Sequence, residues 1–109
     1  MNNQRRKELA NIIDAMETIC MPLDIENLEG VKSDIEMVLM DEEVAFESMP
    51  ENLQYSMRGE ASQEAQDNMN EAIDLIDEFI NDIEEGNEIE DEFQNLVDEV
   101  IGCLIAAAD

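Results

Sequence analysis

The chain of 109 residues carries 30 Asp and Glu against five Lys and Arg, which gives a formal net charge of −25 at pH 7. It contains no histidine, so a histidine-ligated zinc site, a Ser/His/Asp triad and a Cys/His nucleophile are all excluded. Apolar residues make up 44% of the sequence, too many for a disordered acidic tail and enough for the modest core of one small domain.

The charge is distributed unevenly along the chain. All five bases lie in the first 58 residues together with 13 acids, whereas the last 51 residues hold 17 acids and no base. A folded domain loses stability to self-repulsion at such a charge, so the bias needs a physical reason. A basic partner, a multivalent cation or selection for extreme solubility would each supply one.

The cysteines and the apolar runs indicate the cellular compartment of the protein. Cys20 and Cys103 lie 83 positions apart and form no CxxC motif, which is typical of separate thiols in a reducing cytosol. Residues 1–14 lack the apolar stretch of a signal peptide, and the longest apolar run, residues 103–108, is too short to span a bilayer. We therefore expect a soluble, cytoplasmic protein.

The first predicted helix covers about residues 3–20. Asn2 or Asn3 is a suitable N-cap, and Pro22 ends the helix. Its apolar residues recur every three or four positions, as on one side of a helix: Leu9, Ile12, Ile13, Met16 and Ile19.

The second predicted helix covers about residues 23–47. Glu42 interrupts its apolar side, and Gly30 is a weak point near its start. The apolar residues that share this side are Leu28, Val31, Ile35, Val38, Leu39, Ala45 and Phe46.

The next segment predicts a short helical turn over residues 49–55. Pro50 suits the first turn of a helix, and Ser48 with Glu51 has the spacing of a capping box. Ser56 or Gly59 then leads into the third long helix.

The third and fourth long helices are predicted over about residues 57–85 and 88–108. Gly86 can adopt the left-handed conformation that ends a helix, and Asn87 can cap the next one, with Glu90 at its third position. Gly102 either allows a close helix approach or is a tolerated weak point. The apolar residues of the two stripes are Ala65, Met69, Ala72, Ile73, Ile76, Ile80 and Ile83, then Ile89, Phe93, Leu96, Val97, Val100, Ile101, Leu104 and Ile105.

These elements predict a single all-α domain over residues 1–109, built from long antiparallel helical hairpins that form a small bundle. The first two helices either close an up-down bundle or extend as hairpins that dimerise. A third helix of about 40 Å is long for a lone small domain, which favours a homodimer, with coiled-coil-like packing of the stripes. Met16, Met69 and one of Met37 or Met40 are expected in the core.

No metal site, cofactor or catalytic site is expected. If Asn81 is the first position of a calcium loop, Gly86 and Glu92 fall at suitable places. However, Ile83 offers no oxygen at the third position, and Glu88 replaces a residue that is usually apolar. Neighbouring carboxylates on one amphipathic helix lack the pocket that would separate two pKa values, so we expect no enzyme.

Three segments resemble a group of small acidic phage and prophage accessory proteins. The segments are residues 46–54 (FESMPENLQ), 58–60 (RGE) and 70–77 (NEAIDLID), after the basic start of residues 5–7. The group shares an M-P-E-N-L-Q turn and an E-A-I-D-x-L/I-D helix, and the resemblance covers about residues 4–85, so the fourth long helix lies beyond it. Pro22 between the first two helices is a departure. The resemblance implies a phage setting and little about chemistry, because most members have no assigned activity.

Carboxylates form rows on the last two predicted helices. On the third helix they step by three or four positions on the side away from the apolar stripe, and more follow at the tip and on the fourth helix. Neighbouring carboxylates of such a row are separated by about 5 to 6 Å along the helix, which resembles the charge pattern of a nucleic-acid backbone. These candidate contact residues are Asp67, Glu71, Asp74, Glu78, Asp82, Glu85, Glu88, Asp91 and Asp98.

The rows suggest a non-enzymatic inhibitor that mimics nucleic acid and blocks a basic nucleic-acid-binding protein in the host cytoplasm. A CRISPR effector or a restriction nuclease would be the target, and the inhibitor would bind neither nucleic acid nor membrane. A merely solvated helix face stays open as an interpretation. The alternative function is a dimerisation or adaptor protein with an apolar groove at Phe46, Phe79 or Phe93. Residues 5–7 are expected to pair with acids of the same chain or of a second copy.

Overall fold

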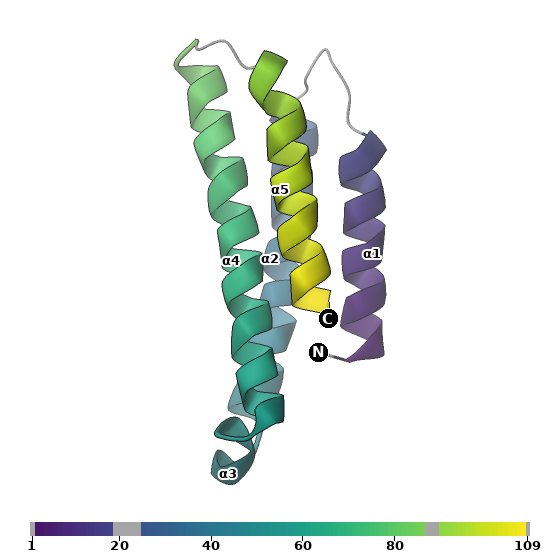
Figure 1. Cartoon of the computed structure of the whole chain (residues 1–109), viewed down its shortest axis with the longest axis vertical. Helices are drawn as coiled ribbons and strands as arrows, with labels where there is room; N and C mark the ends of the chain where they lie inside the picture. The colour runs from purple at the N-terminus through teal and green to yellow at the C-terminus, as the bar shows by residue number, and fades with distance from the viewer. Residues whose placement is uncertain (1, 19–24, 87–89, 109) are drawn as a thin grey trace.

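The computed structural model describes residues 2–18, 25–86 and 90–108, which are helical apart from short connections (Figure 1). The helices are α1 (Asn3–Thr18), α2 (Ile25–Glu47), α3 (Glu51–Gln54), α4 (Met57–Glu84) and α5 (Glu90–Ala108). The described ranges contain no strand, so the all-α class is confirmed, and no helix in them is long and apolar enough to cross a membrane. Parts of the predicted helix ends lie outside the described residues, namely 19–20, 23–24 and 88–89. The predicted roles of Cys20, Pro22 and Asn87 lie outside them as well.

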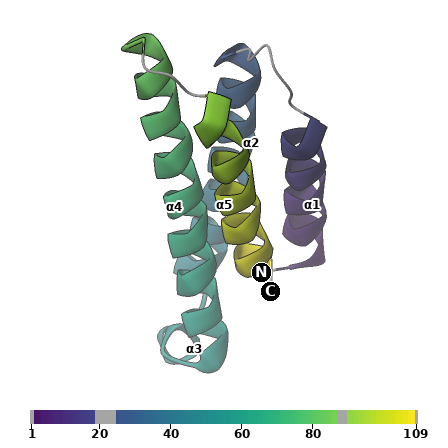
Figure 2. The same ribbon diagram turned by 45° about the horizontal axis from the view of Figure 1, so that its top comes forward.

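The four long helices form a bundle in which each packs against two neighbours, in the ring order α1, α2, α4, α5. Successive long helices run in opposite directions along the bundle axis, and Figure 2 shows the same order in a turned view. The short α3 lies at one end of the bundle, between α2 and α4. With 28 residues, α4 is the longest helix in a molecule that extends 49 Å. Its outward side therefore forms one continuous surface along most of the bundle.

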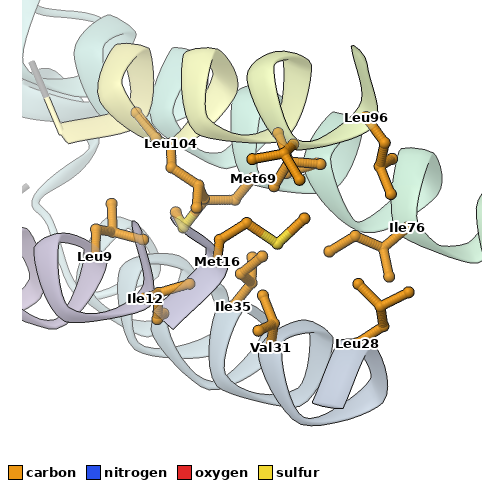
Figure 3. Close-up of a cluster of buried hydrophobic side chains, with 14 of the residues drawn as sticks. Leu9, Ile12, Met16, Leu28, Val31, Ile35, Met69, Ile76, Leu96 and Leu104 are labelled. Atoms are coloured by element: carbon orange, nitrogen blue, oxygen red, sulfur yellow. The ribbon is translucent and has the colours of Figure 1, made fainter. Parts of the chain in front are cut away.

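The core lies along the bundle axis, between the inward sides of the four long helices. Figure 3 shows side chains from all four helices pointing toward one another, among them the fully buried Leu9, Ile35, Met69 and Leu104. Met16 and Met69 are buried, as the sequence predicted. Aliphatic side chains and methionine fill this space because the chain has only three Phe, one Tyr and no Trp.

Three residues that the sequence assigned to the core or to an apolar stripe are exposed instead. Met37 and Met40 both lie on the outward side of α2, because the inward side of that helix is defined by the buried Ile35 and its neighbours one turn away. Ile105 on α5 is exposed as well, since the adjacent Leu104 occupies the inward position. The expectation that Met37 or Met40 packs in the core was wrong.

Glu42 lies on the buried side of α2, where the sequence suggested an interruption of the apolar side. Only 1% of its side chain is exposed, and the Nε of Arg5 on α1 donates a hydrogen bond of 2.5 Å to its Oε2. A buried carboxylate needs such compensation because the loss of hydration is costly. The ion pair holds the start of α1 against α2, and Arg5 pairs with an acid of its own chain.

Two further bases connect neighbouring helices. The Nε of Arg6 donates to the carbonyl oxygen of Ala108 at 2.8 Å, where the free carbonyl groups at the end of α5 favour a cation. The Nζ of Lys32 on α2 lies 2.6 Å from Oδ1 of Asp77 on α4, and this hydrogen bond raises the pKa of Lys32. Three of the five bases thus join one helix to another.

The connection from α2 to α4 differs from its predicted form. The capping box of Ser48 and Glu51 is not formed, because Pro50 is the residue before α3 and no side chain caps that helix. Ser48 directly follows α2 instead, and its N–H closes the last turn of that helix by donating to the carbonyl of Val44 at 3.0 Å. Ser56 directly precedes α4, as expected.

Gln54 and Gly59 fix the entry into α4. The Nε2 of Gln54 donates to the carbonyl oxygens of Phe46 and Met49, at 3.1 and 3.2 Å, and so ties α3 to the end of α2 and the turn that follows it. A Cβ at Gly59 would lie 2.0 Å from the carbonyl oxygen of Gln54, so only glycine fits. Gly102 has nothing within 4 Å of such a Cβ, which makes it a tolerated weak point and not a site of close approach.

The two caps that border the long helices follow the sequence. Asn2 caps α1, because its Oδ1 accepts a hydrogen bond of 2.8 Å from the N–H of Arg5. Gly86 ends α4 in the left-handed conformation, with a φ of 83°. The residue therefore turns the chain away from the end of α4, and α5 packs back against that helix.

Substitution of Gly59 by alanine is expected to destabilise the protein by about 1–3 kcal/mol, because a backbone oxygen must move to admit the new methyl group. Gly102→Ala is the matched control and should stabilise α5 by up to about 1 kcal/mol, since it adds no contact and improves helix propensity. Urea unfolding followed by circular dichroism measures both free energies of unfolding. Equal stability of the two variants would contradict the close contact at Gly59.

Substitution of Arg5 by methionine is expected to cost about 3 kcal/mol, because it removes the guanidinium from beside the buried carboxylate of Glu42. In the double variant Arg5→Met/Glu42→Leu the charge is also gone, and most of the stability should return. Urea unfolding of the wild type, the two single variants and the double variant gives the coupling free energy. A double variant as unstable as Arg5→Met would show that the ion pair does not hold α1 on α2.

Candidate functional site

The outward side of α4 carries most of the acidic residues that the sequence singled out. The opposite side of the helix is buried in the core, at Ala65, Met69, Ala72 and Ile76 among others. Spacings of three and four keep the carboxylates together on the solvent side, because a helix completes one turn in about 3.6 residues. Of the predicted residues, Asp82 is half-buried and the following are exposed: Asp67, Glu71, Asp74, Glu78 and Glu85.

Glu60 and Glu64 extend this row toward the start of α4. Both are exposed, and both continue the spacing of three and four back from Asp67. The sequence prediction omitted them, although the same periodicity would have found them. We call the eight residues the acidic row of α4: Glu60, Glu64, Asp67, Glu71, Asp74, Glu78, Asp82 and Glu85.

A groove between α4 and α5 runs beside the acidic row. Its volume is about 220 Å³, and Glu92 and Glu99 of α5 face Glu78 and Asp82 of α4 across it. The remaining lining residues are Leu75, Phe79, Asn95 and Leu96. Carboxylates from two helices therefore border one groove.

The aromatic residues beneath this groove hold the two helices together. The rings of Phe79 and Phe93 have their centroids 5.9 Å apart, and both side chains are buried. Such a tilted ring pair adds to the stability of the contact between α4 and α5. Phe79 and Phe93 are thus core residues of this chain, and the adaptor function, which places partner contact at Phe46, Phe79 or Phe93, stays a prediction.

The predicted contact residues that follow α4 are Glu88, Asp91 and Asp98, and none of them is among the described residues that line the groove. Asp98 is exposed but does not line the groove, and its Oδ1 accepts a hydrogen bond of 3.0 Å from the Nε2 of Gln94. Glu88 and the side chain of Asp91 lie outside the described residues. Glu92 and Glu99, instead of Asp98, bring charge from α5 to the acidic row.

Cys103 on α5 reports the electrostatic potential of this region. The side chain is half-buried, and its burial raises the pKa of the thiol. The nearby carboxylates of Glu71 on α4 and Glu99 on α5 raise that pKa further, because a negative potential disfavours the thiolate. The acidic row and the α5 acids therefore act on the same point.

No base offsets the acidic row along its length, because the chain has no Lys or Arg after Arg58. Lys32 reaches α4 from α2, but it pairs with Asp77, which is not part of the row. Within the described residues, no group of three or more acids and thiols is arranged to hold a metal ion. The row is thus a surface of repeated single charges, and it is suited to electrostatic contact with a basic molecule.

Comparisons of this chain with models of known protein families, with curated proteins and with solved structures found no match.

The raised pKa of Cys103 predicts slow alkylation. In a Cys20→Ser background, iodoacetamide should modify Cys103 more slowly at pH 8 than it modifies an exposed thiol, because less thiolate is present. Glu71→Gln should lower the pKa and speed the reaction, and added NaCl should act in the same direction. Asp98→Asn on α5 removes one negative charge as well, and this control should change the alkylation rate little. Mass spectrometry of timed samples gives the rates, and an unchanged rate in Glu71→Gln would contradict the electrostatic cause.

Proposed function

We propose that this protein is a non-enzymatic phage-type inhibitor that mimics nucleic acid and blocks a basic nucleic-acid-binding defence protein of the host. The target class is a CRISPR effector or a restriction nuclease, and the acidic row of α4 makes the contact. The observation that carries the proposal is a continuous row of eight carboxylates along α4 and its C-cap residue Glu85, without a base among them.

The charge density of the row supports a nucleic-acid-like contact. Eight carboxylates between Glu60 and Glu85 extend over about 38 Å of helix, which is one charge per about 5 Å. One strand of DNA carries a charge every about 3.4 Å along its axis, and a duplex carries one every about 1.7 Å. The row is therefore closer to a single strand than to a duplex, and Glu92 and Glu99 of α5 add charge beside it.

The rigidity of α4 supports the same function. The helix packs against α2 and α5 along its inward side, and Gly59 and Gln54 fix its start against α3. A charged row that is already ordered loses little conformational entropy when it binds. A disordered acidic tail of equal charge would have to be ordered at that step.

The phage setting rests on the resemblance of residues 46–54, 58–60 and 70–77. The first two segments contain Gln54 and Gly59, which form the entry into α4, and the third lies within α4. The resembling segments thus form the entry into α4 and contain three residues of the acidic row, Glu60, Glu71 and Asp74. A phage benefits from such a protein because occupation of a nucleic-acid channel in a host nuclease prevents cleavage of phage DNA.

The homodimer also stays a prediction. Its sequence argument was that a helix as long as α4 needs a second copy to cover its apolar stripe. The stripes of α4 and α5 pack against each other and against α1 and α2 in one chain, so that argument no longer requires a dimer.

Neutralisation of three neighbouring carboxylates of the row should weaken inhibition. In the variant Asp74→Asn/Glu78→Gln/Asp82→Asn, the concentration that half-inhibits DNA cleavage should rise at least about tenfold, because several charge contacts are lost together. The control Asp14→Asn/Glu17→Gln/Glu51→Gln removes the same charge from exposed positions outside the acidic row and should change this concentration little. Cleavage of labelled DNA by a Cas9-type effector and by a restriction nuclease, at 50 and 300 mM NaCl, supplies the measurement.

The salt dependence provides a second criterion. Inhibition by the wild type should weaken as NaCl rises, since salt screens the contact between the row and the basic channel. Equal potency of the two triple variants would contradict the role of the acidic row. Failure of the wild type to inhibit either enzyme would contradict the target class.

A further inference from the structure

The outward side of α2 carries three exposed apolar side chains. Met37, Met40 and Val44 are 68%, 64% and 57% exposed, and their spacing of three and four places them on one side of the helix. The inward side of the same helix is buried at Ile35 and Leu39. We call Met37, Met40 and Val44 the α2 stripe.

A groove between α1 and α2 adjoins the α2 stripe. Its volume is about 280 Å³, and its apolar lining consists of Ile12 from α1 with Met37 and Val38 from α2. Polar residues complete the lining: Glu8, Asn11, Asp34 and Asp41. Met37 belongs to both the groove and the stripe, so the two form one apolar surface with carboxylates at its border.

This surface lies away from the groove between α4 and α5. In the ring order α1, α2, α4, α5, the contact of α1 with α2 is across the bundle from the contact of α4 with α5. Figure 1 shows α1 and α4 on opposite sides of the molecule. A partner at the α2 stripe would therefore not compete for the α4–α5 groove.

The charges around the surface select its occupant. Glu8, Asp34 and Asp41 border the groove, and the whole chain has a net charge of −25. A second copy would bring acids against acids across an apolar contact of only a few residues, which is unfavourable. A partner with Lys and Arg around its own apolar side chains would form ion pairs at the border instead.

We propose that the α2 stripe and the adjoining groove bind a basic amphipathic helix of a partner protein. The groove accepts the apolar side of such a helix, as in other helix-in-groove contacts, and the border carboxylates pair with its bases. Methionine suits this contact because its unbranched, polarisable side chain adapts to different apolar surfaces. The contact is independent of nucleic-acid mimicry, because it uses none of the acidic row.

A pair of synthetic peptides tests the proposal. One is a fluorescein-labelled 18-residue Leu/Lys peptide with all Leu on one helical side, and the other has the same composition in a scrambled order. At 150 mM NaCl the amphipathic peptide should bind the wild-type protein at least about tenfold more tightly than the scrambled one, because only the former can bury an apolar side. Fluorescence anisotropy gives both dissociation constants.

Two triple variants separate the two surfaces. Met37→Gln/Met40→Gln/Val44→Thr should remove the preference for the amphipathic peptide, and circular dichroism should show an intact fold, because all three positions are exposed. Asp74→Asn/Glu78→Gln/Asp82→Asn, the control on α4, should weaken both peptides alike and keep the preference. A preference that survives the α2 variant, or no preference in the wild type, overturns the proposal.

Methyl-labelled methionine locates the contact by NMR. Titration with the amphipathic peptide should shift the signals of Met37 and Met40, assigned by single Met→Leu substitutions, while the buried Met16 and Met69 stay in place. Met57, exposed in the first turn of α4, is the solvent-accessible control. Shifts at Met57 without shifts at Met37 and Met40 overturn the proposal. A dimer of the wild type in sedimentation equilibrium that the α2 variant lacks overturns it in favour of a second copy.

Discussion

Repulsion among 30 carboxylates is the constraint on which this structure depends, because only five bases are present to offset it. The bundle meets the constraint by placing bases where two helices meet. Arg5 compensates the buried Glu42, Arg6 contacts the end of α5, and Lys32 joins α2 to α4 through Asp77. Most other carboxylates point outward into water, where their mutual repulsion is screened. A core of aliphatic side chains then supplies the cohesion that the charges oppose.

This use of the bases leaves the outward side of α4 uniformly negative. A row of like charges lowers the stability of a helix by itself, since acids four positions apart repel one another. The helix is held in place by its packing against α2 and α5 and by the close contact at Gly59. The cost of keeping the row and the rigidity of its support both favour the interpretation that the row serves binding. The α2 stripe is a second surface with a different chemistry on another helix.

The helices and their buried sides were predictable where the apolar residues of a single helix follow a clear spacing of three and four. The periodicity of Leu9, Met16, Met69 and Ile76 places each on the inward side of a helix, and the structure buries all four. Six of the eight acids of the row were found in the same way. Prediction failed where two sides of one helix were both partly apolar, as at Met37 and Met40, or where a polar residue had a distant partner. The burial of Glu42 depends on Arg5, which lies on another helix and cannot be located from local spacing.

The sequence by itself determined the helices, most of their inward sides and the absence of any base from the last 51 residues. These properties are local, because side-chain periodicity and residue type decide them within a few turns of chain. Only the tertiary structure decided that Glu92 and Glu99, not Asp98, face the α4 acids, that Phe79 and Phe93 are core residues, and that the α2 stripe stays uncovered. Such facts depend on how helices are rotated against one another, and a rotation by one residue, about 100°, exchanges an exposed side chain for a buried one.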